Sequence, residues 1–89
     1  MSTETRYLAD IAVDIYDAMD EQYGAKRPNW WAYAKPYVDA LSTLESIDDN
    51  YYYDSARSIV GYLIANLSYW RGDTARAIKA ELKSIAGIN

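Results

Sequence analysis

A stretch of thirteen uncharged residues, Ser58 to Trp70, most constrains the fold of this chain, because one quarter of all its residues are charged. The stretch reads SIVGYLIANLSYW and lies between Arg57 and Arg71. It is too short to cross a bilayer as a helix, which needs about 20 apolar residues. An ordinary surface helix has a polar face, which this stretch lacks. It therefore predicts a central helix covered on two sides, either by its own chain or by a second copy.

The length of 89 residues predicts one helical domain, residues 1–89. The chain has neither cysteine nor histidine, so it lacks a thiolate nucleophile and the side chain that titrates nearest neutral pH. No tuned acid–base pair is visible, and we expect no enzymatic activity, no cofactor and no metal. The first residues, MSTETRYLAD, have neither the basic nor the apolar region of a signal peptide, so we do not expect them to be one. We expect a cytoplasmic protein without a membrane partner.

Charge is unevenly distributed along the chain, whose net charge is −4. Residues 1–54 carry eleven acidic and four basic side chains, whereas residues 55–89 carry two acidic and five basic ones. Such asymmetry can mark a surface for an electrostatic partner. The simpler explanation, which we favour, is that the two halves pair inside one fold.

Apolar side chains at helical spacing predict four helices, and no strand pattern competes with them. The first helix covers residues 4–22, from a cap at Thr3 to a stop at Gly24. The fourth helix follows a cap at Asp73. The side chains expected in the core are Leu8, Ile11, Ala12, Ile15 and Met19 from the first helix, and Ala75, Ile78, Leu82 and Ile85 from the fourth.

The second helix contains Pro36, which removes a backbone hydrogen bond and disfavours helical geometry at the residue before it. We expect either a turn over residues 30–34 followed by a helix over residues 36–47, or one kinked helix. Asn29 is the expected cap. The side chains expected to point inward are Tyr33, Tyr37, Ala40, Leu44 and Ile47.

The third helix is expected over residues 55–70, between a cap at Asp54 and a stop at Gly72 in the left-handed conformation. The four helices together predict an all-α fold, a compact bundle of three to four helices with the third at its centre. The inward side chains of the third helix are Ala56, Ile59, Val60, Leu63, Leu67 and Trp70.

The third helix also has a second face, made of small residues with tyrosines beside them. Small side chains allow helices to approach closely, and tyrosine supplies rigid contact area. Another helix of the same chain and the seam of a homodimer explain this face about equally well. Its small residues are Ser58, Gly61, Ala65 and Ser68, and its tyrosines are Tyr62 and Tyr69.

The aromatic residues are ten tyrosines and three tryptophans, without phenylalanine, and both types are enriched at protein interfaces. Successive helical side chains point about 100° apart, so Tyr51, Tyr52 and Tyr53 cannot all face one core. Trp30 and Trp31 meet the same limit. These side chains either cover the ends of the bundle or form a patch for a protein partner.

Asp10, Asp14, Asp17 and Glu21 fall on one stripe of the first helix, with Asp20 beside them. A solvated face is the usual explanation of such a stripe. A divalent-cation site and mimicry of nucleic-acid phosphate are alternatives, although the spacing is not that of an EF-hand. Carboxylates near a helix C-terminus oppose the helix dipole. The basic residues available to compensate are Lys26, Arg27, Arg76, Lys79 and Lys83.

Nucleic-acid binding is not expected, because the three aligned cations of the fourth helix fall short of a basic footprint. Three strings of the sequence are distinctive: W-x-YAKPY at Trp31–Tyr37, D-S-x-x-x-IV at Asp54–Val60 and WRG-x-x-AR-x-IKAEL at Trp70–Leu82. With these strings, about two thirds of the chain resembles a group of short bacteriophage proteins known only as hypothetical. The resemblance excludes the acidic first helix and implies no residue roles. It implies a host-cell cytoplasm and an accessory role during infection or lysogeny.

We therefore expect a non-enzymatic phage accessory protein that binds a host or phage protein, with inhibition of a host or defence factor as one example. Two alternatives stay open, a structural or assembly component and a small-molecule or nucleotide binder that uses a tyrosine-rich face. The residues expected to contact a partner are Trp30, Trp31, Tyr51, Tyr52, Tyr62, Ala65, Tyr69, Asp10, Asp14, Asp17 and Glu21.

Overall fold

The computed structural model describes residues 6–51 and 54–87, which form four helices and one short hairpin. The mostly helical fold expected from the sequence is confirmed, whereas the expectation of no strand is wrong. The hairpin pairs Asn50 with Ser55 and Tyr51 with Asp54 in antiparallel register. The elements are α1 (Leu8–Tyr23), α2 (Trp31–Leu41), β1 (Asn50–Tyr51), β2 (Asp54–Ser55), α3 (Ala56–Asn66) and α4 (Asp73–Ala86).

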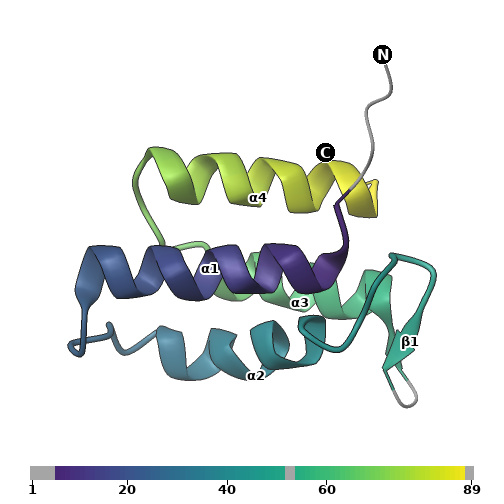
Figure 1. Cartoon of the computed structure of the whole chain (residues 1–89), viewed down its shortest axis with the longest axis horizontal. Coiled ribbons are helices and arrows are strands. Elements are labelled where there is room, and N and C mark those ends of the chain that lie inside the picture. Colours follow the sequence, from purple (N-terminus) through teal and green to yellow (C-terminus); the bar gives the residue numbers. More distant parts are fainter. Residues whose placement is uncertain (1–5, 52–53, 88–89) are drawn as a thin grey trace.

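The four helices run alternately in opposite directions (Figure 1). In this view α4 lies above α1 and α2 below it, and α3 lies behind α1. The main packing contacts join α1 to α2, α2 to α3, α3 to α4 and α4 to α1. Because α3 is one member of this ring, it lies between α2 and α4 but is not surrounded on all sides.

One apolar core fills the space between the helices, and the described part of the chain buries no polar or charged residue in it. Every core side chain predicted for α1 and for the third helical segment is buried. Trp70 lies beyond the end of α3, yet its ring is fully buried. Its indole N–H donates to the Gln22 side-chain oxygen at 2.9 Å, which satisfies the polar edge of the ring.

The ends of α1 are set by the backbone. The helix begins at Leu8 rather than near residue 4, after Tyr7 in an extended conformation. The amides of Leu8 and Ala9 donate to the carbonyls of Glu45 and Leu44, so the turn after α2 satisfies the free amides at this end. The predicted cap Thr3 lies outside the described residues. Gly24 ends the helix as predicted, with a φ of 60°.

Of the two expectations for the second helix, the division into a turn and a separate helix is wrong, because α2 is one helix that continues through Pro36. It ends at Leu41, six residues before the expected end. Trp30, not Asn29, occupies the cap position. The expected inward face is also partly wrong, since Tyr33 is 70% exposed. Burial of the Trp31 ring turns Tyr33 about 200° away from the core. The buried side chains of α2 are Trp31, Ala34, Val38, Ala40 and Leu41, while Leu44 is buried and Ile47 half-buried in the segment that follows.

The start of α3 differs from the expectation by one residue. Ser55 caps it, and the Ser55 hydroxyl accepts from the Ser58 amide. The predicted cap Asp54 lies one residue further from the helix, in β2, where it pairs with Tyr51. At the other end α3 stops at Asn66, where the chain enters a turn.

A lysine from α4 satisfies the backbone at the end of α3. Lys79 Nζ donates to the carbonyl oxygens of Leu67 at 3.1 Å and Trp70 at 2.7 Å. Burial and the nearby cations Arg71, Lys83 and Arg76 lower the pKa of Lys79. These two hydrogen bonds replace the last turn of helix that the sequence predicted.

The separation of the third and fourth helices is confirmed, but Gly72 has a different role from the one expected. Its φ of 117° is positive, yet its ψ of 169° is not that of a left-handed helix stop. Gly72 instead occupies the cap position of α4, and Asp73 is the first helical residue. In α4, Ala75, Ile78 and Leu82 are buried as predicted and Ile85 is half-buried.

The burial of Leu63 gives the first prediction. Replacing Leu63 by alanine should lower the free energy of unfolding by roughly 2–5 kcal/mol, because a fully buried leucine loses its transfer energy and leaves a cavity. The change is measured by chemical denaturation. The matched control is Val13→Ala in α1, where the side chain is 56% exposed and the expected change is below about 0.5 kcal/mol. Equal effects of the two substitutions would contradict the placement of Leu63 in the core.

The backbone at Gly72 gives a second prediction, with a control of opposite sign. Gly72→Ala should destabilise the protein by about 1 kcal/mol or more, since residues with a side chain rarely adopt its conformation. Gly61 lies inside α3, and a Cβ added there meets no atom within 4 Å. Gly61→Ala should therefore stabilise dilute protein by roughly 0.5–1 kcal/mol. Thermal or urea unfolding in which Gly72→Ala is as stable as the parent would refute this account of the turn.

Candidate binding surface

Tyrosine side chains from two elements meet at a groove beside α2, which we call the tyrosine groove. Tyr33 and Tyr37 come from α2, and Tyr51 comes from β1. The groove has a volume of about 450 Å³. Most of its lining is apolar, and Asp54 contributes a carboxylate. Its lining residues are Ala32, Tyr33, Pro36, Tyr37, Ala40, Tyr51, Asp54 and Ile59.

The local sequence explains why a groove forms here. Ala32 and Ala40 have short side chains on either side of Pro36, Ala32 exposed and Ala40 buried, so they leave space beside α2 at the groove. Tyr33 turns away from the core because Trp31 occupies the inner face. The hairpin places Tyr51 across from α2. The short side chains of α2, with Tyr33 and Tyr37 of α2 and Tyr51 of the hairpin around them, therefore leave an apolar hollow.

The tyrosine groove adjoins the outer face of α3 through Tyr62. The rings of Tyr37 and Tyr62 contact each other with their centroids 5.6 Å apart. Tyr62 is 51% exposed and Tyr69, in the turn after α3, is 70% exposed. We call Ser58, Gly61, Tyr62, Ala65, Ser68 and Tyr69 the outer face of α3.

No other helix of the described chain covers this outer face. Ser58, Ala65 and Ser68 are exposed, and the position beside Gly61 is open. The explanation that a helix of the same chain packs here is therefore wrong. What remains is an exposed face that carries no charged side chain, next to an apolar groove.

Trp30 and Trp31 lie at one end of the bundle rather than on this surface. Trp31 is 6% exposed and contacts the ring of Tyr16 edge to face, with centroids 5.5 Å apart. Trp30 is half-buried between Tyr23 and Trp31. The Arg27 guanidinium lies 5.9 Å from the centre of the Trp31 ring. Trp31 is therefore a core residue. Tyr52, another predicted contact residue, lies outside the described residues.

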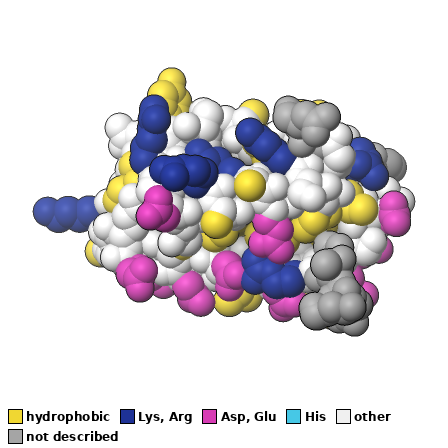
Figure 2. Space-filling model, turned by 90° about the horizontal axis from the view of Figure 1, so that it is seen from above, with side chains coloured by type: hydrophobic (Ala, Val, Ile, Leu, Met, Phe, Trp, Pro, Cys, Tyr) yellow, Lys and Arg dark blue, Asp and Glu magenta, His cyan; other side chains and the backbone are white. Residues whose placement is uncertain are grey.

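The acidic stripe follows α1 along one edge of the molecule, where acidic side chains gather in Figure 2. Asp10, Asp17 and Glu21 are exposed, whereas Asp14 is half-buried. Asp20, beside the stripe, forms an ion pair with Arg27. Most of the stripe therefore faces solvent.

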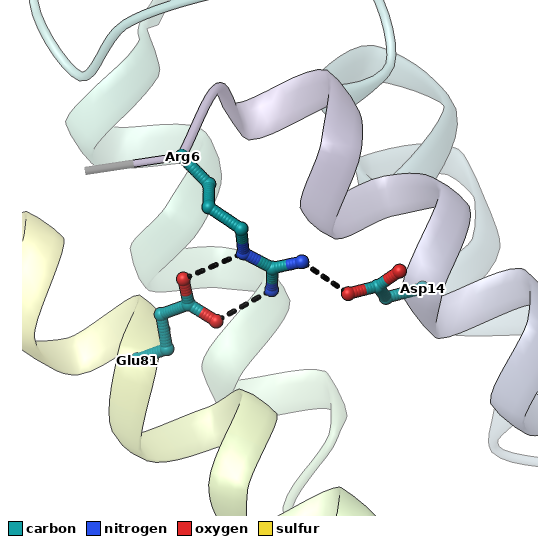
Figure 3. Close-up of polar contacts among 3 residues, drawn as sticks. All are labelled: Arg6, Asp14 and Glu81. Atoms are coloured by element: carbon teal, nitrogen blue, oxygen red, sulfur yellow. Dashed lines mark hydrogen bonds and ion pairs between the residues drawn. The ribbon is translucent and has the colours of Figure 1, made fainter. Parts of the chain in front are cut away.

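Asp14 is held by Arg6, a residue that the sequence did not single out. Figure 3 shows the Arg6 guanidinium between Asp14 of α1 and Glu81 of α4. Arg6 Nε lies 3.0 Å from Glu81 Oε2, and Nη2 lies 2.6 Å from Oε1. The hydrogen bonds that Arg6 donates to Glu81 and, with a smaller effect, to Asp14 raise the pKa of Arg6 above its usual range. Arg6 therefore joins the start of the chain to α1 and α4.

The basic residues of α4 do not neutralise the acidic stripe. Lys79 donates to the backbone at the end of α3, and Arg76 pairs with Asp73 at 3.4 Å. Among the described residues no ion pair joins an α1 carboxylate to a basic side chain of α4. The two halves of the chain do pack together in one fold, through α2 with α3 and α1 with α4, but the one ion pair that joins them among the described residues is that of Arg6 with Glu81.

A second hollow of about 420 Å³ lies between α1 and α4. Asp14, Asp17, Glu21 and Glu81 contribute carboxylates to it, and Arg6 contributes a guanidinium. Across residues 6–51 and 54–87, no three acidic side chains lie close enough together to hold a metal ion. The alternative of a divalent-cation site thus finds no support in this part of the chain.

Comparison of the chain with protein-family models, curated proteins and solved structures finds no match. The helices of the described segments are also too short or too polar to cross a membrane. The arrangement of the surface residues is therefore the basis for a functional proposal.

A polar cluster where α1 meets α2 gives a prediction about pH. Tyr16 donates a hydrogen bond to Asp39, and Lys35 Nζ lies 3.0 Å from the other Asp39 oxygen. Burial, followed by the bond to Asp39, raises the pKa of Tyr16. Burial alone would raise the pKa of Asp39, but the bonds from Tyr16 and Lys35 outweigh it, and the pKa is lowered.

A lowered pKa means that Asp39 adds stability that is fully present above its unfolded pKa of about 3.9. This stability is lost as the pH falls through the lower folded value. Asp39→Asn should therefore reduce stability at neutral pH by a few tenths to about 1 kcal/mol and flatten the loss of stability below about pH 4. Tyr16→Phe should reproduce part of the effect. A parallel pH profile for Asp39→Asn and the parent would contradict this assignment.

Proposed function

We propose that this chain is a non-enzymatic binding protein that contacts another protein through the tyrosine groove and the outer face of α3. The observation that carries the proposal is the exposure of Tyr33 at an apolar groove and of Tyr62 and Tyr69 on the adjoining outer face of α3. Tyrosine buries a large apolar ring at low cost in conformational entropy and keeps a hydroxyl for hydrogen bonding. Protein interfaces use such residues as anchors.

The composition supports binding rather than catalysis. The sequence contains no histidine and no cysteine, and the tyrosine groove offers one carboxylate, Asp54, without a base or nucleophile beside it among its lining residues. General acid–base catalysis needs a proton donor or acceptor within reach of the reacting group and with a matched pKa. An apolar groove bordered by tyrosines is better suited to enclosing a side chain of a partner.

The charge of the chain favours a protein over a nucleotide as the ligand. Nucleotides and nucleic acids carry negative phosphates, and the chain has a net charge of −4 with Asp54 at the groove itself. The described lining of the groove contains no lysine or arginine to hold a phosphate. Stacking of a base on Tyr33 would have to overcome this repulsion.

The resemblance of residues after α1 to short bacteriophage proteins supports a host or phage protein as the partner, met in the host cytoplasm. Inhibition of a host or defence factor and a role in phage assembly are both consistent with such binding. A second copy of the chain can occupy the same face as a homodimer. These possibilities differ in the identity of the bound protein, which a capture experiment measures.

Tyr33→Ser tests the proposal, because Tyr33 lines the groove and is not a core residue. Immobilised parent protein should retain a stoichiometric partner from the lysate of infected or uninfected host cells. Tyr33→Ser should weaken retention by about 30-fold, the effect of removing an interface anchor worth about 2 kcal/mol. Val13→Ser, on the exposed side of α1, is the control and should bind like the parent.

Equal retention by the parent and Tyr33→Ser would place the contact elsewhere and refute the proposal. A rise in melting temperature with ATP or GTP, abolished by Tyr33→Ser, would instead identify a nucleotide binder. Captured virion components would indicate the assembly role, whereas a captured host enzyme or regulator would indicate inhibition.

A further inference from the structure

We infer that a second copy of this chain covers the outer face of α3, with the two α3 helices antiparallel about a two-fold axis. The inference rests on the proposed function, because this face adjoins the tyrosine groove through the contact of Tyr62 with Tyr37. It adds the chemical identity of the occupant and the register in which the two copies meet.

The lack of charge on this face is what a symmetric contact requires. A two-fold axis brings the same patch of both copies together, so every charged residue near the axis would meet a like charge. Residues 58–70 contain no charged side chain. The stripe of α1, in contrast, would place the carboxylates of one copy against those of the other. The exposed face of α3 is therefore suited to meeting a copy of itself, and the acidic edge is not.

The residue sizes along the face are self-complementary in one antiparallel register. If Tyr62 lies opposite Ala65 of the second copy, the next turn places Ser58 opposite Tyr69 of that copy. Both steps are four residues, or about one turn, and they run in opposite directions. Each exposed tyrosine then faces a small residue.

The backbone around these residues permits close approach. The space beside Gly61 is open, so a second helix can come near the backbone of α3 there. The Ser68 amide donates to the Ala65 carbonyl, and the Leu67 amide donates to that of Leu63, so helix-like turns continue toward Tyr69. The exposed rings of Tyr62 and Tyr69 lie about two turns apart. Each ring can therefore pack into the space above a small residue of the other copy, Tyr62 over Ala65 and Tyr69 over Ser58.

The size of the face predicts a weak dimer. A stable interface buries about 800 Å² on each partner, and one short helix face supplies less than this. We therefore expect dissociation in the micromolar to low millimolar range. At low expression the tyrosine groove would then remain available to a different protein.

Sedimentation from micromolar to millimolar concentration tests the pairing. The parent should change from monomer to dimer across this range. Ala65→Arg should weaken the dimer by about 100-fold or more, because two guanidinium groups would meet near the axis in place of two small side chains. Val13→Arg makes a similar change at an exposed position of α1 and should dimerise like the parent. A parent that stays monomeric, or a dimer that survives Ala65→Arg, would overturn the inference.

Cysteine cross-linking tests the register, and the absence of native cysteine makes single variants unambiguous. A mixture of Tyr62→Cys and Ala65→Cys should form a mixed disulfide on oxidation, because that bond needs Cα atoms about 4.4–6.8 Å apart. A mixture of Val13→Cys and Ala65→Cys is the control and should not. Cross-linking of Ala65→Cys with itself in preference to the mixed product would overturn the antiparallel register.

The two proposals fail in different ways. If the parent is monomeric throughout but Tyr33→Ser still abolishes capture of a different protein, the dimer is wrong and the binding function stands. If the dimer forms with the expected sensitivity to Ala65→Arg but Tyr33→Ser changes no capture, the proposed function of the groove is wrong.

Discussion

Burial of one stripe of side chains, from Ala56 to Trp70, is the interaction on which the rest of the structure depends. Its members are at most 3% exposed, and α2 and α4 both pack against the helix that carries most of them. Burying a leucine or valine side chain stabilises a fold by roughly 1.5–3 kcal/mol. The end of the stripe is fixed by polar contacts as well, through Gln22 to Trp70 and Lys79 to the backbone. Because these contacts fix the rotation of α3 about its own axis, they also determine which of its side chains face outward.

That fixed outer side explains why the surface divides into two regions. The acidic stripe lies on α1, while the outer face of α3 carries small residues and tyrosines without charge. Arg6 draws Asp14 and Glu81 together, so it partly neutralises the acidic region and leaves the tyrosine region unaffected. The molecule therefore has a solvated edge and, separately, a face suited to contact.

The parts of the fold that could be predicted are those whose signal is local and aliphatic. The stripes of α1 and α3 repeat at helical spacing, and every side chain predicted for them is buried. The phase of α2 could not be predicted as well, because tyrosine is suited to both the core and the surface and Tyr33 was placed on the wrong side. The hairpin has two residues in each strand, too few to show an alternating pattern. The end of α3 depends on Lys79, which lies in the next helix.

In the candidate site, too, residues within one helix could be predicted from the sequence, whereas contacts between separate elements could not. The exposed tyrosines Tyr62 and Tyr69 and the small residue Ala65 could be identified from the composition of one helix. The tyrosine groove could not, because it combines Tyr33 and Tyr51 from elements whose contact depends on the fold. Trp31 was also predicted to contact a partner because it is aromatic, but it belongs to the core, where its ring packs edge to face against Tyr16. Arg6 was missed because its partner Glu81 lies 75 positions away in the sequence.

The central claim is that two copies of this protein meet through the outer face of α3, and not through the acidic edge. Backbone amide NMR spectra of labelled protein, recorded from micromolar to millimolar concentration, test it most directly. The account predicts shifts that change with concentration at Gly61, Tyr62, Ala65 and Tyr69, with little change along α1. Spectra that do not change, or changes that cluster at Asp10, Asp17 and Glu21, would contradict it.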